Sequence, residues 1–363
     1  MNICDLSTHV AEHRVYIDRA LSRVVDSGWF ILGPEVGAFE RSFSAYVGVG
    51  YCVAVGNGTD AIELALRAIG IQNGDRVATV ANAGMYTSTV LQAIGASPIY
   101  MDVSIESHVV TIDVVVDAIR QGARAVVVTH LYGQAIPRIE DIATVCRESG
   151  IPLVEDCAQA HGALVNDRQV GSFGDFGCFS FYPTKNLGAL GDGGAIVIND
   201  PILAEKLAYL RQYGWTKKYH VELPGRNSRL DELQAAVLSE FLPLLKSWNA
   251  RRRHIASLYS THISCPSLVL PPVGAEDYVA HLYVVRSTDR EALRTHLNSL
   301  GIASDVHYPT PDHRQPVFGK RFQDISLPNT ECLASEVLTL PCYPEMTDRD
   351  VQRVIDAVNS WKP

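Results

Sequence analysis

Short apolar runs rich in β-branched residues alternate with stretches of helical periodicity from about residue 50 onward, which leaves few folds open to the chain. The expected strands are residues 51–55, 76–80, 97–103, 125–129 and 151–154. The expected helices between them are residues 60–69, 88–94, 112–120 and 139–148. This alternation is typical of a mostly parallel sheet with helices on both faces. The sequence therefore predicts an α/β fold.

The pattern changes after residue 170, where glycine-rich turns appear and the apolar runs become sparser. The elements expected in this part are strands at 178–182, 195–198 and 279–286, and helices at 230–248, 290–300 and 348–358. We therefore expect a large α/β domain over residues 1–245, which includes an N-terminal segment 1–30. A smaller α+β domain is expected over residues 246–363.

Charge and composition exclude several classes of function. The chain of 363 residues has a net charge of −9, whereas binding to a phosphate backbone requires a basic face, so nucleic acid is not an expected partner. No apolar run is long enough to span a bilayer, and the N-terminus lacks the segments of a signal peptide. The eight cysteines form no Cys-x-x-Cys pair. We expect a soluble cytoplasmic protein with reduced thiols, no membrane partner and no metal site.

A lysine, Lys185, follows the apolar strand expected at 178–182 and precedes the glycine-rich segment 188–194. Lysine is rarely buried without a partner or a task. A Schiff-base lysine needs a partly desolvated amine with a lowered pKa, and the adjacent glycines let the backbone approach a ligand closely. The alternative is a lysine that extends from the strand end to solvent.

Two carboxylates, Glu155 and Asp156, end another apolar strand. Ligands of open α/β sheets bind at the carboxyl ends of strands, where a carboxylate can keep a pyridine nitrogen protonated. Asp156 is the better candidate because it lies further along the run, although the pattern does not separate the two neighbours. The alternative is a helix cap or a solvated strand end.

The segment 53–61 reads as a strand, a glycine-rich turn and the start of a helix, which together favour an anion such as phosphate. One alternative is a dinucleotide site in which Asp75 is the carboxylate that binds the ribose, but the third glycine of that motif is absent. A second alternative is a capped helix that binds no ligand. Tyr86 follows a further strand end, where it either stacks on a flat ring or joins the core. A pyridoxal phosphate (PLP) site needs this phosphate cradle, aromatic ring, carboxylate and lysine, whereas a nicotinamide site does not need the lysine.

Three segments carry a family resemblance: residues 155–162 (Glu-Asp-Cys-Ala-Gln-Ala-His-Gly), 180–187 (Ser-Phe-Tyr-Pro-Thr-Lys-Asn-Leu) and 225–236 (Gly-Arg-Asn-Ser-Arg-Leu-Asp-Glu-Leu-Gln-Ala-Ala). In these segments, and over nearly the whole chain from residue 28 to residue 344, the sequence resembles the DegT/DnrJ/EryC1/StrS sugar aminotransferases. The resemblance implies the aspartate aminotransferase-like fold (fold type I), in which a large domain with a mostly parallel mixed sheet precedes a smaller α+β domain.

The resemblance also implies PLP as cofactor and a role for each matching residue. Lys185 would form the Schiff base and move protons, and Asp156 would pair with the pyridinium nitrogen. Tyr86 would stack on the cofactor ring, and Gln159 would lie near its 3′-hydroxyl. The phosphate would be held by Gly58, Thr59, Asp60 and Ser180. Asn227 would reach the phosphate of a neighbouring subunit, which implies a homodimer.

Within the family, residues 213–220 and 306–316 resemble nucleotide-sugar 3-aminotransferases that act on dTDP-linked 3-keto-6-deoxyhexoses. The resemblance implies L-glutamate as amino donor, with L-glutamine as the alternative. It makes Lys217, Lys218, Tyr308 and His313 candidates for contacts to the sugar diphosphate or the hexose, although a lysine pair is also common in solvated loops. Trp215 and Thr216 depart from the Ser and Arg of that group.

Two alternatives remain at this point. The first keeps the enzyme class but places the ketone at C4 of a UDP-, dTDP- or GDP-linked sugar. The second is a non-catalytic regulatory protein, which would need no Schiff base. Some relatives that act as dehydratases have histidine in place of the Schiff-base lysine, whereas this chain keeps Lys185, which favours transamination.

Overall fold

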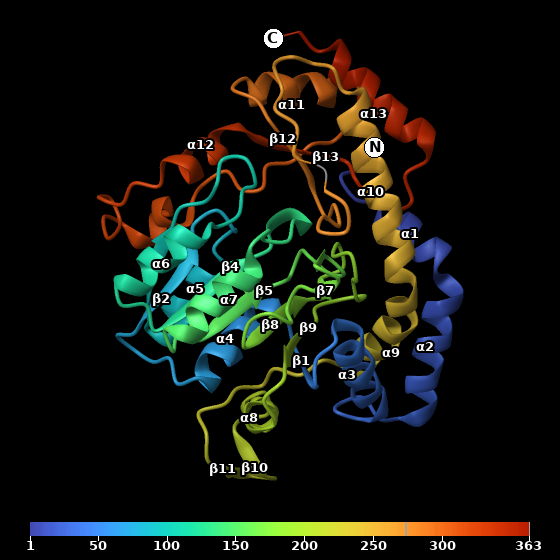
Figure 1. Ribbon diagram of the computed structural model, residues 1–363. Helices are drawn as coiled ribbons and strands as arrows, with labels where there is room; N and C mark the ends of the chain where they lie inside the picture. Colours follow the sequence, from blue (N-terminus) through green and yellow to red (C-terminus); the bar gives the residue numbers. More distant parts are fainter. Residues whose placement is uncertain (273, 363) are drawn as a thin grey trace.

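A computed structural model describes residues 1–272 and 274–362 and contains the seven-stranded sheet that positions the site (Figure 1). The strand order is β1-β9-β8-β5-β4-β2-β3. The strands are β1 (Tyr51–Val55), β2 (Arg76–Val80), β3 (Ser97–Met101), β4 (Ala125–Thr129), β5 (Leu153–Asp156), β8 (Phe176–Ser180) and β9 (Gly194–Ile198). Every neighbouring pair is parallel except the two that involve β9. The mostly parallel mixed sheet predicted from the sequence is confirmed.

Helices cover both faces of this sheet, which explains why its strands are apolar throughout. One face packs against α4 (Gly58–Ala68), α5 (Tyr86–Ile94) and α8 (Pro201–Leu210). The other face packs in one region against α6 (Ile112–Arg120) and α7 (Ile139–Glu148). In a second region it packs against α2 (Arg14–Ser27), α3 (Pro34–Val47) and α9 (Glu232–Phe241). All five residues of β4 are buried, as expected for a strand enclosed on both sides.

The C-terminal part has a core of its own. Its strands β12 (Tyr283–Arg286) and β13 (Val337–Leu340) pair antiparallel beside the helices α10 (Leu245–His262), α11 (Arg290–Ser299) and α13 (Asp348–Ser360) (Figure 1). A return segment from this part, residues 312–331, which includes the start of α12 (Pro328–Glu336), lies against the large sheet's end at β2 and β3 (Figure 1). The division into two domains near residue 245 stays a prediction, although α10 begins at that residue.

Two expected elements differ from the structure by more than two residues at an end. The helix expected at 230–248 is instead α9, a single 3-10 turn at Leu242–Leu244, and then α10. Pro243 lies in that turn, and proline lacks the N–H that a continuous helix would use there. The strand expected at 279–286 begins only at Tyr283.

The remaining elements are short. The N-terminal helix α1 (Leu6–Glu12) precedes α2, and two hairpins pair β6 (Leu164–Val165) with β7 (Arg168–Gln169) and β10 (Trp215–Lys217) with β11 (His220–Val221). Further 3-10 turns span Leu131–Gly133, Asp312–Arg314 and Pro316–Phe318. Among the described helices, none has the length and apolarity needed to cross a membrane.

Candidate active site

The carboxyl ends of six strands lie at one edge of the sheet, because β1, β8, β5, β4, β2 and β3 run in the same direction. The segments that leave this edge carry the lysine, the carboxylates and the glycine-rich turn singled out in the sequence. This is the position at which open α/β sheets bind ligands.

Lys185 lies in the loop after β8, which folds back through hydrogen bonds from Lys185 N to the Tyr182 carbonyl (2.8 Å) and from Ala189 N to the Phe181 carbonyl (2.8 Å). Within the described part of the chain, its amine has neither a hydrogen bond nor an ion pair. Burial lowers the pKa of this amine from 10.5 to about 8, and the nearby charge of Asp156 opposes that shift. The residue as a whole is partly exposed, whereas its amine is buried.

The structure gives Glu155 and Asp156 different environments. Glu155 is fully buried and accepts four hydrogen bonds: from the amides of Gly171 (2.9 Å), Phe173 (2.8 Å) and Gly174 (2.7 Å), and from His130 Nε2 (2.9 Å). Because His130 Nδ1 accepts from the Ile136 amide (3.1 Å), the ring proton lies on Nε2 and points to Glu155. Glu155 therefore ties strand ends together and has no acceptor capacity left for a ligand.

Asp156 is the carboxylate available for chemistry. Its Oδ1 accepts from the Ala158 amide (3.1 Å), and its Oδ2 has only a long contact of 3.5 Å with Thr129 Oγ1. Burial raises the pKa of Asp156, and the Ala158 amide and the Lys185 charge partly offset that effect. A cationic partner on a ligand would stabilise the ionised form further.

A cradle for an anion lies where α4 begins. Asn57 caps the helix by accepting from the Asp60 amide (2.8 Å), which leaves the amides of Gly58 and Thr59 as free donors of the first turn. A Cβ on Gly58 would lie 2.7 Å from the Cβ of Ser180, so only glycine lets the helix start approach the end of β8 this closely. The Asp60 carboxylate itself accepts from Ser228 Oγ (2.6 Å) and pairs with Arg226 (3.1 Å), so it braces the cradle.

Two tyrosines and a glutamine form a wall beside these groups. Tyr86 is half exposed and packs edge-on to Tyr308, with ring centroids 6.3 Å apart. Gln159 donates from Nε2 to the Tyr308 hydroxyl (3.1 Å), and its Oε1 accepts from the Tyr132 amide (2.7 Å). Tyr308 thus comes from the C-terminal part to the strand ends, as a substrate contact would require.

Four other candidate residues lie elsewhere. Lys217 and Lys218 are exposed on the β10–β11 hairpin, which projects beyond α8 at the end of the molecule opposite β12 and β13 (Figure 1). Asn227 is also exposed and pairs with Gln212 beside that hairpin. His313 has no solvent-exposed side-chain surface, and its Nε2 hydrogen-bonds Glu331 Oε1 (2.8 Å), so its ring is closed off from solvent.

A buried polar network that was not predicted from the sequence lies behind the lysine loop. Asn186, adjacent to Lys185, donates to Asn249 Oδ1 (2.8 Å) and to the Val279 carbonyl (3.1 Å), and accepts from His281 Nδ1 (3.0 Å). Burial holds the pKa of His281 well below its ordinary value, so this imidazole stays neutral. No local signal in the sequence joins these residues, because they come from three distant segments.

The residues at this edge fit PLP. A buried amine without a partner can form a covalent bond to the aldehyde, Asp156 can face the ring nitrogen, the Gly58 and Thr59 amides can bind the phosphate, and Tyr86 offers a flat face. A nicotinamide dinucleotide would leave the unpaired lysine unexplained.

Comparison with known proteins gives one consistent answer. The sequence profile of the DegT/DnrJ/EryC1/StrS aminotransferase family matches residues 12–359. The dTDP-3-amino-3,6-dideoxy-alpha-D-galactopyranose transaminase of Aneurinibacillus thermoaerophilus is 45% identical over 346 residues, which cover 95% of each chain. The dTDP-3-amino-3,4,6-trideoxy-alpha-D-glucose transaminase of Streptomyces venezuelae is 42% identical over 361 residues, covering 98% of this chain and 95% of that protein.

Solved structures agree. The crystal structure of S. venezuelae DesV in complex with a ketimine intermediate superposes with a TM-score of 0.93 at 40% identity, over 98% of this chain and 97% of that one. The structure of NtdA from Bacillus subtilis with bound cofactor PMP superposes with a TM-score of 0.90 at 31% identity, over 96% and 81% of the two chains. The fold type I architecture expected from the sequence is confirmed.

Proposed function

This chain belongs to the DegT/DnrJ/EryC1/StrS aminotransferase family, and we propose that it transfers the amino group of L-glutamate to C3 of a dTDP-linked 3-keto-6-deoxyhexose. It is a transaminase of a PLP-dependent family. The observation that carries the proposal is the meeting of an unpaired lysine, an available carboxylate and a free helix start at one sheet edge. The choice of substrate rests on two relatives named for dTDP-3-amino sugars, each more than 40% identical over nearly the whole chain.

Each residue then has a defined task. PLP, when bound, supplies an electron sink for the pair released as a proton leaves the substrate carbon. Lys185 moves that proton, for which a pKa near 8 suits an amine that must both accept and return it. Asp156 would keep the ring nitrogen protonated, and the amides of Gly58 and Thr59 with Ser180 Oγ would hold the phosphate. Tyr86 would stack on the ring, and Gln159 would lie near its 3′-hydroxyl.

The active unit in this proposal is a homodimer in which each site borrows residues from the other subunit. Lys217, Lys218 and Asn227 are exposed, and among the described residues none of their side chains has a hydrogen bond or ion pair to the site of its own chain, so in this proposal they serve a site in a second copy. Large apolar side chains are also exposed: Trp29 and Phe30 before α3, and Tyr182 and Leu190 in the lysine loop. A dimer interface would cover such residues.

Mixed dimers test the shared site. Lys185→Ala and the double variant Lys217→Ala/Lys218→Ala are each expected to be inactive with the nucleotide sugar. If sites are shared, a dimer with one subunit of each kind contains one site with a native lysine and a native hairpin. Activity that reappears on mixing and reassembly supports the proposal, whereas two inactive variants that stay inactive as confirmed mixed dimers contradict it.

The reaction is tested by absorbance spectroscopy and then by an acceptor panel. Wild-type protein with PLP should show the near-visible band of the lysine-bound cofactor, L-glutamate should convert it to the pyridoxamine form, and Lys185→Ala should lack it. The panel compares dTDP-3-keto sugars with UDP-, dTDP- and GDP-4-keto sugars. Turnover confined to the 4-keto sugars would overturn the C3 assignment and leave the transaminase intact.

A further inference from the structure

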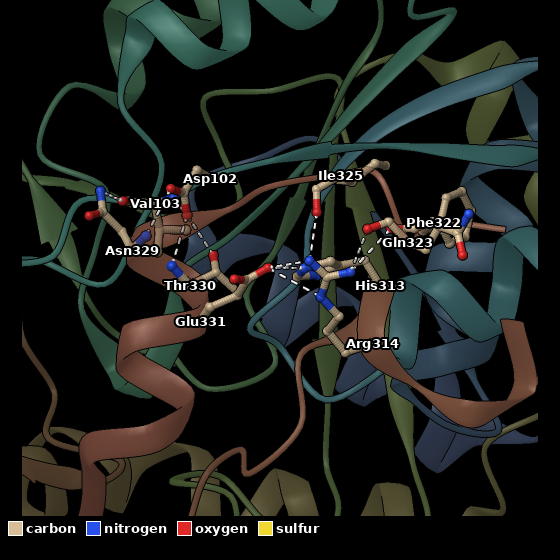
Figure 2. Close-up of polar contacts among 10 residues, drawn as sticks. All are labelled: Asp102, Val103, His313, Arg314, Phe322, Gln323, Ile325, Asn329, Thr330 and Glu331. Atoms are coloured by element: carbon tan, nitrogen blue, oxygen red, sulfur yellow. Dashed lines mark hydrogen bonds and ion pairs between the residues drawn. The ribbon is translucent and has the colours of Figure 1, made fainter. Parts of the chain in front are cut away.

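The return segment, residues 312–331, runs from the C-terminal part back to the end of the sheet that contains β2 and β3. Figure 2 shows the hydrogen bonds that hold this segment in shape. Glu331 Oε1 accepts from His313 Nε2 and Arg314 Nη2 (both 2.8 Å), and Arg314 also donates to the carbonyls of Gln323 (3.0 Å) and Ile325 (2.8 Å). The segment is therefore a fixed structure and not a loose connection.

Asp102, which follows β3, anchors the far end of the segment. Its carboxylate accepts from the amides of Asn329 (3.1 Å) and Thr330 (2.9 Å) and from Thr330 Oγ1 (2.8 Å), and thereby caps α12 (Figure 2). The near end is anchored by Asp312, whose amide donates to the Ala81 carbonyl (2.8 Å). Both ends of the segment are thus tied to the large sheet.

Asp312 also caps α5. Its Oδ1 accepts from the Met85 amide (2.9 Å) and its Oδ2 accepts from Ser88 Oγ (2.6 Å). Met85, the residue before the helix, has a φ of 72° and contributes no side-chain cap of its own. The cap comes instead from a residue 227 positions further along the chain. A carboxylate at this position also complements the helix dipole.

The first residue of α5 is Tyr86, so the cap sets the position of the aromatic ring in the candidate site. Tyr308, which packs against Tyr86, belongs to the strand-end wall just before the return segment. A Cβ on Gly84 would lie 2.8 Å from the Tyr308 ring, which shows how tightly the chain before Tyr86 is enclosed. Asp312 is itself buried, and burial raises its pKa to about 6, so the chain keeps a carboxylate here at an energetic cost.

We propose that Asp312 is a positioning residue of the active site, which holds Tyr86 against the cofactor ring through its cap on α5. The inference rests on the proposed function, because it takes Tyr86 to face the cofactor. It differs from a general role in folding, because it predicts an effect that passes through Tyr86 alone.

The test is the dissociation constant of PLP, measured by absorbance titration of each apoenzyme. Asp312→Ala should weaken PLP binding by about tenfold, the effect of losing a cap worth ~1.4 kcal/mol. Asp312→Asn should bind PLP with a dissociation constant within about threefold of wild type. The asparagine Oδ1 still accepts from the Met85 amide, and its NH2 group donates to Ser88 Oγ, which can in turn donate to the Tyr100 hydroxyl (3.1 Å). Glu331→Ala, which alters the same segment without contact to α5, is the matched control and should leave PLP binding unchanged.

A double-variant cycle shows whether the effect passes through Tyr86. If it does, adding Asp312→Ala to Tyr86→Ala should not weaken PLP binding further. Additive losses would overturn the inference, as would equal losses in Asp312→Ala and Glu331→Ala, or wild-type affinity in Asp312→Ala.

If Asp312→Ala does not fold, Ser88→Ala decides the question, because it removes the contact to Asp312 Oδ2 (2.6 Å) and, besides it, only the Ser88 contact with the Tyr100 hydroxyl (3.1 Å). A weakening of about threefold supports the inference, and unchanged affinity overturns it. Failure of the proposed function gives a different result, since wild-type protein would then show no PLP band at all.

Discussion

Replacing Glu155 by glutamine tests the separate roles of the two adjacent carboxylates. The glutamine side chain has the same size, but its NH2 group must take the place of either Oε1 or Oε2. Both of these oxygens accept from N–H donors, so the NH2 group faces other donors in either position. If Oε1 keeps the amides of Phe173 and Gly174, the NH2 group faces His130 Nε2 and the Gly171 amide. His130 cannot adapt by moving its proton to Nδ1, because that atom would then face the Ile136 amide.

The expected cost follows from these contacts. One buried amide without an acceptor costs ~1–3 kcal/mol, and losing a hydrogen bond to a charged acceptor costs ~1.5–3 kcal/mol, so the free energy of unfolding should fall by about 3–5 kcal/mol. At ~2.1 cal/mol/K of unfolding entropy per residue, this corresponds to a fall of about 4–7 °C in Tm for a chain of 363 residues.

The measurement is thermal unfolding of the apoenzyme by circular dichroism. Glu140→Gln is the matched control, because Glu140 is partly exposed, lies 3.6 Å from Arg168 and accepts from Asn166 Nδ2 (3.0 Å), a bond that glutamine can keep; its Tm should change by less than about 1 °C. A Tm for Glu155→Gln within 1 °C of wild type would refute the reasoning. So would a loss of the glutamate half-reaction in a variant of unchanged stability, because that would make Glu155 the catalytic carboxylate.

Three further predictions follow from the site and its supports. Asp156→Asn should abolish the glutamate half-reaction, measured by absorbance, and half-reaction rates equal to those of wild type would contradict this. The apoenzyme of this variant should also be more stable at neutral pH, because burial raises the pKa of the Asp156 carboxyl above its value in the unfolded chain. Because burial lowers the pKa of Lys185 to about 8, the rate at which the apoenzyme captures PLP should rise with pH through about 8 and level above it, and a midpoint near 10.5 in stopped-flow absorbance would contradict this. Glu232 accepts from the amides of Gly33, Glu35 and Val36 at the start of α3 (2.8, 2.9 and 2.8 Å). Glu232→Gln should therefore lower the free energy of unfolding by about 2–3 kcal/mol in denaturant titrations, and a loss below about 0.5 kcal/mol would contradict this.

The strands of the large sheet could be predicted closely because burial on both faces leaves a continuous apolar run in the sequence. The runs 51–55, 76–80 and 125–129 coincide with β1, β2 and β4. Prediction failed where the decisive feature was a single residue within an otherwise consistent pattern. Pro243 divides a helical stretch that periodicity alone makes continuous, so α9 and α10 are separate helices.

The sequence by itself determined the fold class and the chemical groups at the strand ends, because these depend on local periodicity and on residue types that follow each strand. The tertiary structure decided which group is free to act. Glu155 and Asp156 are neighbours with the same functional group, and only the donors gathered around Glu155 from residues 130 and 171–174 distinguish them. Likewise, the cap that Asp312 places on α5 joins residues 227 positions apart. Contacts of this kind depend on how distant segments pack, and no local pattern in the sequence records them.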